Sequence, residues 1–214
     1  MHETLGVSRP DRYALLVRRA SASVGWTDMN QQGLTGSWYE PATDGQGFEV
    51  EVFPNFVAPD KAWFTFDTTA GGADHQRWYT LSGNVQTGQP AATVTIYQNV
   101  GGNFNSLPAT SAVAVGTATI RFDTCTSGQL DYTFTDGSGR SGSIPLTRLT
   151  QSATCSTTSA RPTNSDSALG GNWFDAATSG QGFIVDVSPG SGTLFFAWYT
   201  YAPTGSGDGT TRQR

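Results

Sequence analysis

Apolar and polar residues alternate along short stretches of this chain, and glycine-rich turns separate the stretches. From Phe48 to Val52, Phe and Val alternate with Glu, a period of two that is typical of a half-buried β-strand. The pattern predicts strands near residues 36–40, 48–52, 62–66, 76–82, 93–98, 117–123, 129–135 and 143–149. Asp136-Gly137, between the last two of them, is a strong hairpin signal.

Strands joined by sequential hairpins predict an all-β fold, an antiparallel up-and-down meander. Eight strands are also enough for such a sheet to close into a small barrel and lose its edges. A flattened sandwich is the competing arrangement. Composition favours strands over helices, because the chain has 26 glycines and only 14% charged residues.

The chain also contains an internal repeat with a constant offset of 135 residues. Leu34–Phe48 aligns with Leu169–Phe183, and Ala62-Trp63 aligns with Ala197-Trp198 at the same offset. The repeat predicts four segments. They are a poorly ordered N-terminal segment at 1–32, a complete β-barrel-like domain at 33–156, a Ser/Thr/Asn linker at 157–168, and a truncated second copy at 169–214.

The second copy stops where its fourth strand would begin, because Gln213-Arg214 matches Gln76-Arg77. We therefore expect that the natural product continues beyond Arg214 or that the chain is a fragment. Three strands with open edges leave apolar faces uncovered. The second copy is expected to be unstable, swapped, or paired with another chain through those edges.

Two cysteines, Cys125 and Cys155, both fall in the first copy. The preferred interpretation is a disulfide between them, and two free buried thiols are the alternative. A disulfide would close a loop of about 30 residues and stabilise the domain by roughly 3 kcal/mol. It would also indicate an oxidising compartment.

Charge and composition argue against several function classes. The net charge of -5, with no basic stripe, argues against a nucleic-acid partner. No apolar run approaches the ~20 residues of a transmembrane segment. The run Tyr13–Val17 is too short for the apolar core of a signal peptide, so no export signal is expected within the chain.

Catalytic and metal-binding constellations are also missing from the sequence. The histidines are His2 and His75, and no phosphate-binding loop, nucleophile elbow or metal-ligand spacing occurs, so neither metal nor cofactor is expected. Glu49 and Glu51 share one strand face about 7 Å apart, near the separation in inverting glycosidases. Because Ile184 replaces Glu49 in the second copy, a solvated face is the favoured interpretation.

One motif, Gly36-x-Trp-Tyr-Glu-x-x-x-x-Gly-Gln-Gly-Phe48, recurs as residues 171–183. Its glycines are expected to provide a positive-φ turn. Gln46 either ties this turn to a neighbouring strand or lines a barrel mouth and binds a polar ligand. The aromatic residues on three consecutive strands likewise either fill a core or form a ligand platform.

The motif, followed by Ala62-Trp-Phe-Thr-Phe66 and Arg77-Trp-Tyr-Thr80, resembles a family of uncharacterised secreted bacterial β-repeat proteins. The resemblance covers most of residues 34–214. It implies an exported location, secreted or periplasmic, and no particular activity.

Together these patterns favour a non-catalytic exported β module that binds a small ligand through aromatic residues. The ligand is expected to be a carbohydrate, such as a glycan, or a small apolar molecule. The expected ligand-binding residues are Trp38, Gln46, Trp63, Trp78 and Tyr79. The alternative is a structural or adhesive surface repeat without a small-molecule ligand. A hydrolase with an unrecognised site ranks third.

Overall fold

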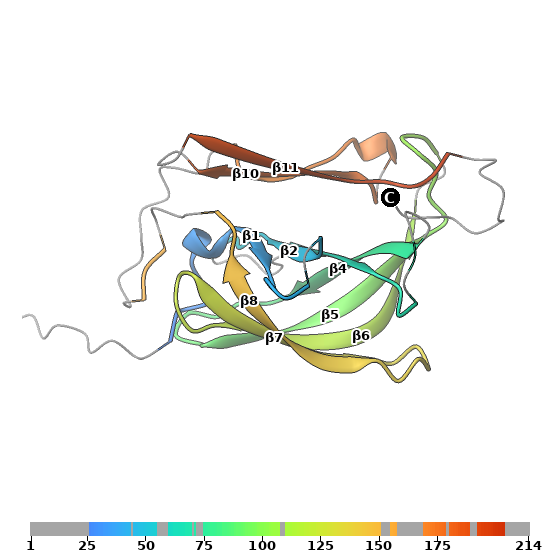
Figure 1. Ribbon diagram of the computed structural model, residues 1–214. Coiled ribbons are helices and arrows are strands. Elements are labelled where there is room, and N and C mark those ends of the chain that lie inside the picture. Colours follow the sequence, from blue (N-terminus) through green and yellow to red (C-terminus); the bar gives the residue numbers. More distant parts are fainter. Residues whose placement is uncertain are drawn as a thin grey trace, which may run out of the picture.

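The computed structural model of this chain shows a β-barrel with a small sheet packed on its outside (Figure 1). It describes residues 26–43, 45–54, 60–69, 71, 75–107, 110–150, 155–157, 169–178, 180–188 and 192–203. Predictions made for residues 1–25, for most of the linker and for residues 204–214 lie outside the described residues.

Eight antiparallel strands form a closed barrel in sequential order. They are β1 (Gly36–Tyr39), β2 (Gly47–Val50), β3 (Asp60–Phe66), β4 (Gln76–Gly83), β5 (Ala91–Val100), β6 (Ser111–Phe122), β7 (Ser127–Phe134) and β8 (Ser141–Arg148). The pairing of Trp38 with Arg148 joins β1 to β8 and closes the barrel. The predicted all-β meander is confirmed, and it closes as a barrel rather than a flattened sandwich.

Every second residue along each strand faces inward, and these side chains fill the barrel. The rings of Trp38 and Phe122 lie 4.3 Å apart near one end. Farther along, Phe48 stacks on Trp63 with centroids 5.3 Å apart. Burying one large apolar side chain stabilises a fold by about 1.5–3 kcal/mol, so these rings contribute a large share of the barrel's stability.

The segment before β1 closes one end of the barrel. The Thr27 amide donates to the carbonyl of Phe122, and the Met29 amide donates to that of Gln89. Met29 is fully buried, and so is Leu34, the last residue of the 3-10 helix η1 (Gln32–Leu34). Residues 26–32 are therefore packed, which differs from the expectation of poor order. Their apolar side chains are too sparse to show a period, so only the barrel end reveals their role.

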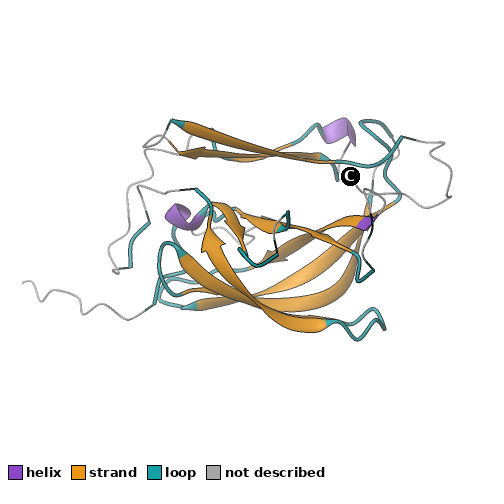
Figure 2. Ribbon diagram, in the orientation of Figure 1, coloured by secondary structure: helices purple, strands orange, loops and turns teal. Residues whose placement is uncertain are grey.

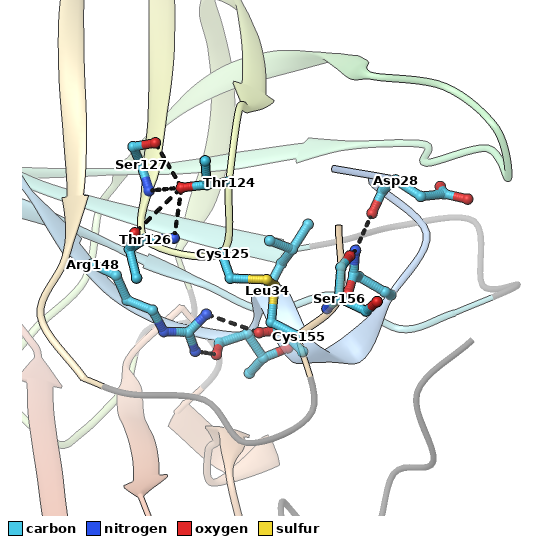
Figure 3. Close-up of a disulfide and its surroundings, with 12 residues drawn as sticks. Asp28, Leu34, Thr124, Cys125, Thr126, Ser127, Arg148, Cys155 and Ser156 are labelled. Carbon is cyan, nitrogen blue, oxygen red and sulfur yellow. Dashed lines mark hydrogen bonds between the residues drawn. A yellow bond between two sulfur atoms is a disulfide. The ribbon is translucent and has the colours of Figure 1, made fainter. Parts of the chain in front are cut away.

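A disulfide joins Cys125, in the β6–β7 turn, to Cys155 after β8, and their Cα atoms are 5.7 Å apart. Figure 3 shows this disulfide beside Leu34 and Arg148. Gln31 holds the same region, because its amide nitrogen donates to the carbonyl of Ser156 and its amide oxygen accepts from the Ser156 amide. The predicted disulfide is confirmed, and it links the end of the barrel domain to the β6–β7 turn.

The small sheet consists of three strands in the order β11-β10-β9. They are β9 (Gly171–Trp173), β10 (Gly182–Ser188) and β11 (Thr193–Tyr199), with the 3-10 helix η3 (Ala176–Thr178) between the first two. Figure 2 shows it as a separate layer beside the barrel strands. Contacts between β1 and β10 place this layer against the outer face of the barrel.

The register of the small sheet matches that of the first three barrel strands. Trp173 pairs with Phe183, which pairs with Trp198. In the barrel, Trp38 pairs with Phe48, and Phe48 with Trp63, each 135 positions earlier. The sequence repeat thus coincides with a repeat of strand pairing.

Candidate functional site

The aromatic residues predicted to bind a ligand lie in packed surroundings. Trp38, Trp63 and Tyr79 are 1%, 6% and 3% exposed and belong to the barrel core. Trp78 points outward from β4 but is only 1% exposed, because Tyr199 and Tyr201 pack on it at centroid distances of 5.3 and 5.7 Å. The structure therefore brings three of them together inside the barrel and separates Trp78 from them.

Gln46 fastens its turn to the third strand of its own sheet. Its amide oxygen accepts a hydrogen bond from the Thr65 hydroxyl at 2.6 Å. In the small sheet, Gln181 accepts from the Thr200 hydroxyl at the same distance. A tie between turn and strand, one of the two roles expected for this glutamine, is therefore present in both places, but it runs through a threonine hydroxyl rather than the expected backbone hydrogen bonds. Its role in holding a ligand stays a prediction.

Gln181 makes additional contacts that Gln46 is not seen to make. Its amide nitrogen donates to the carbonyl of Asn103 at 2.8 Å, and its oxygen accepts from the Asn105 amide at 3.0 Å. Asn103 and Asn105 belong to the loop between β5 and β6. The Gly-Gln-Gly turn of the small sheet thus fastens that sheet to the barrel.

Glu49 and Glu51 correct a prediction from the sequence. They were expected on a solvated face, but they are only 4% and 7% exposed. They point outward from the barrel, as the alternation requires, and the small sheet covers that outer face. The alternation of apolar and polar residues correctly separates the two faces of β2. It cannot predict that a sheet formed by a distant part of the chain covers the outer face.

A reciprocal exchange of hydrogen bonds joins the two layers. The Ser37 amide and hydroxyl donate to Asp186 at 3.0 and 3.2 Å. Likewise, the Asn172 amide donates to Glu51 at 3.1 Å, and its side-chain amide donates to the same carboxylate. Ser37 corresponds to Asn172 and Glu51 to Asp186 at the offset of 135. Reciprocal contacts of this kind define a two-fold interface, here within one chain.

Burial controls the electrostatics at this junction. It raises the pKa of Glu49 to about 8, an effect that the nearby Asp186 reinforces, while a hydrogen bond from Ser37 and the charge of Arg148 oppose it. Among the described residues, Glu49 Oε2 has no hydrogen-bond partner. Burial therefore favours the protonated form of Glu49, which spares the junction an additional buried negative charge.

Arg148 is the cation of the same region. Burial lowers the pKa of its guanidinium to about 10, while Asp186 and Glu49 act in the opposite direction. The side chain donates to the carbonyls of Gly33, Thr35 and Thr150, and it lies 5.1 Å from the centroid of Trp38. It thus closes the barrel end and remains charged at neutral pH.

The far side of the small sheet is apolar and open. We call this side the apolar face, and it consists of Trp173, Phe183, Val185, Val187, Leu194, Phe196 and Trp198. Trp173, Phe196 and Trp198 are 53%, 52% and 48% exposed. Phe183 stacks on Trp198 with centroids 5.4 Å apart. None of the ligand-binding residues expected from the sequence lies on this face, although it holds the counterparts of the core residues Trp38 and Trp63.

Charged and aromatic side chains fill the opposite barrel end. The Arg140 guanidinium lies 3.9 Å from the centroid of Phe134 and donates to the Tyr79 hydroxyl at 3.0 Å. It also pairs with Asp136 at 2.8 Å. Hydrogen bonds, above all those from Ser138, lower the pKa of Asp136 to about 2.

An open hollow of about 380 Å³ lies along β6, β7 and β8. It is lined mainly by hydroxyl-bearing residues, namely Thr117, Thr119, Tyr132, Thr133 and Ser141, together with Ala118, Asp131 and Gly142. The residues predicted to bind a ligand do not line it. A polar hollow of this kind matches neither an apolar pocket nor a catalytic cleft with convergent titratable groups.

In the described part of the chain, no group of three or more His, Cys, Asp or Glu residues is placed to hold a metal ion. Among the described residues, no helix has both the length and the apolar character needed to cross a membrane. No protein-family model, curated protein or solved structure matches this chain.

Proposed function

We propose that this chain is a non-catalytic structural or adhesive β module that contacts its partners through the apolar face of β9–β11. The observation that supports this proposal most directly is the exposure of about half of Trp173, Phe196 and Trp198. Contiguous exposed apolar patches on soluble proteins are typical of interaction surfaces. Catalysis, in contrast, requires titratable groups within one accessible cleft, and the small sheet covers both Glu49 and Glu51.

We also propose that the module is built from two copies of one β unit. Three correspondences support this interpretation: the strand register, the glutamine–threonine tie, and the indole hydrogen bond. Trp38 donates to the carbonyl of Leu34 at 3.1 Å, and Trp173 donates to that of Leu169 at 3.2 Å. The two copies dock through their outer faces, which leaves the second copy's core-type face available to a partner.

An exported location, secreted or periplasmic, is part of the same proposal. The disulfide between Cys125 and Cys155 supports it, because such bonds persist mainly in oxidising compartments. The resemblance of the Trp38–Phe48 motif to secreted bacterial β-repeat proteins points the same way. Accessibility of the module to protease on intact cells or in a periplasmic extract would test the location.

Hydrophobic-interaction chromatography tests the proposed surface. We expect a phenyl matrix to retain the chain, and we expect Phe196→Asp to elute distinctly earlier because it places a charge on the apolar face. Val113→Asp is the matched control, because Val113 is 48% exposed but lies on the barrel strand β6. Equal retention of the chain and Phe196→Asp would rule out the apolar face as the contact surface.

Glycan binding is the second candidate function. The row formed by Trp173, Phe183 and Trp198 favours it, because aligned rings can stack on sugar rings. Titration of tryptophan fluorescence with a glycan panel tests this candidate. A saturable change that Trp198→Ala abolishes, and that Val113→Asp retains, would support a sugar site on this face. A change lost only on Trp78→Ala, in a variant shown to fold, would instead support the site predicted from sequence.

A further inference from the structure

The apolar face is complementary to an apolar β-surface and not to a charged one. Its residues are arranged in rows across the sheet, Trp173–Phe183–Trp198 and then Val185–Phe196. The equivalent row in the barrel, Trp38–Phe48–Trp63, packs against residues such as Phe122 and Phe134 from the far wall. We therefore expect the apolar face of the small sheet to pack against a similar apolar surface.

The barrel of the same chain does not provide that wall. Its strands close on themselves, and aromatic and aliphatic side chains fill its interior. Its outer face already contacts the opposite side of the small sheet through Ser37–Asp186 and Glu51–Asn172. Within the part of the chain that the structure describes, only one side of the small sheet is therefore covered.

Two apolar faces packed together would bury enough surface for a specific interface. An aromatic side chain presents about 150–250 Å², so three half-exposed rings contribute roughly 300 Å². Leu194, a member of the face, is 62% exposed, and Leu169, just before β9, is 64% exposed. Phe104 lies 5.3 Å from Trp198 and adds to its border. The sum is roughly 600 Å² per chain, or about 1,200 Å² for two, the lower end of specific interfaces.

We propose that a second copy of this chain covers the apolar face, with the same face of each chain packed on the other about a two-fold axis. This proposal rests on the proposed function and specifies its partner. Two such sheets would pack about 10 Å apart, like the layers of a β-sandwich. The face carries no charged residue, so pairing it with itself brings no like charges together.

Sedimentation equilibrium of the 214-residue chain between about 1 and 300 μM tests the pairing. We expect a monomer–dimer equilibrium with a dissociation constant on the order of micromolar, appropriate to a small apolar interface. Phe196→Asp should weaken the dimer at least about 100-fold, because it buries an uncompensated charge. Val113→Asp should associate like the parent chain.

Charge complementation excludes misfolding as the explanation. Phe196→Asp and Phe196→Lys should each be monomeric alone, and an equimolar mixture should form a heterodimer, since opposite charges then meet across the two-fold axis. Circular dichroism, together with a thiol assay for the Cys125–Cys155 disulfide, verifies that each variant is folded.

Several outcomes would overturn the pairing. One is a chain that stays monomeric at 300 μM, and another is equal dimerisation of Phe196→Asp and the parent. A mixture of the two charge variants that remains monomeric would also contradict it. A monomeric chain that a phenyl matrix still retains would leave the proposed contact surface standing while removing the second copy as its partner. Saturable glycan binding by such a monomer would assign the face to sugar instead.

Discussion

The barrel strands β1–β3 and the small sheet β9–β11 share a pattern and a register but have opposite environments. Trp38 is 1% exposed and its counterpart Trp173 is 53% exposed, while Trp63 and Trp198 are 6% and 48% exposed. Both first tryptophans nevertheless keep the same indole hydrogen bond to a leucine carbonyl. Strand pairing and turn geometry are therefore local properties, whereas burial depends on the strands β4–β8 that complete the barrel.

The pair Trp38 and Trp173 should show the largest contrast. Trp38→Ala removes a filled core position and should cost about 3–5 kcal/mol of unfolding free energy. Trp173→Ala removes a half-exposed ring and should cost less than about 1 kcal/mol. Urea denaturation measured below 1 μM, where the proposed dimer dissociates, checks both values. Equal costs would mean that the apolar face is covered even in the monomer.

Docking of the small sheet should depend on pH through Glu49. Burial raises the pKa of this carboxyl from 4.5 to about 8, so the docked state takes up a proton that an undocked, exposed Glu49 would lack. The stabilisation is complete below pH 4.5, declines as pH rises toward 8, and then levels off. The docking equilibrium should change about tenfold per pH unit in that interval.

Hydrogen exchange of the β10 amides as a function of pH, corrected for the intrinsic exchange rate, measures this effect. Glu49→Gln keeps a neutral amide at the site and should make docking nearly independent of pH between 5 and 8. The amides of β7 in the barrel provide an internal reference. An unchanged pH profile in Glu49→Gln would assign the dependence to another group, and Asp186 and Arg148 are the charged groups that face Glu49.

The reciprocal carboxylates separate docking from barrel stability. Asp186→Ala leaves the buried Ser37 amide without its acceptor and should destabilise docking by about 1–3 kcal/mol. Glu51→Ala should have a similar effect through Asn172. Proteolysis of the small sheet should accelerate in both variants, while the urea midpoint of the barrel stays the same. A barrel midpoint lowered as much as docking would contradict a purely interfacial role.

Substitution of Gln46 and of Gln181 should give the smallest difference in stability. Gln181→Ala removes the Thr200 tie and the contacts with Asn103 and Asn105, and it should weaken docking by about 1 kcal/mol or more. Gln46→Ala removes the equivalent tie to Thr65 and should cost less, because Gln46 is partly exposed. Thermal unfolding of the barrel and exchange of β10 amides distinguish the two. A larger effect for Gln46 would contradict the expectation that the contacts of Gln181 with the β5–β6 loop add to the shared tie.

Much of the fold was predictable from local features of the sequence. Alternation located the strands to within a few residues, although β5 and β6 extend beyond the predicted ranges to Ala91–Val100 and Ser111–Phe122. Their extra residues, including Ser, Ala, Gly and Asn, lack a strong period. The two cysteines predicted the disulfide that the structure contains.

The candidate site was far less predictable. Glu49 and Glu51 alternate with core residues in the way that a solvated face would, and no pattern distinguishes water from a covering sheet. Trp78 is similarly ambiguous, because it faces outward and is covered by Tyr199 and Tyr201, more than 120 residues later in the chain. The repeat itself supplied a signal for the apolar face, since Trp173 and Trp198 align with the barrel-core residues Trp38 and Trp63.

The sequence alone determined which residues share a strand face, where the turns lie, and that one pattern occurs twice, because each of these depends on neighbours along the chain. The tertiary structure decided which faces are covered. Closure of β1 against β8 buried Trp38 and Trp63, and docking of β10 buried Glu49 and raised its pKa. Covering a face depends on surfaces that are distant in sequence, so the same pattern forms a core in the barrel and an open apolar face in the small sheet.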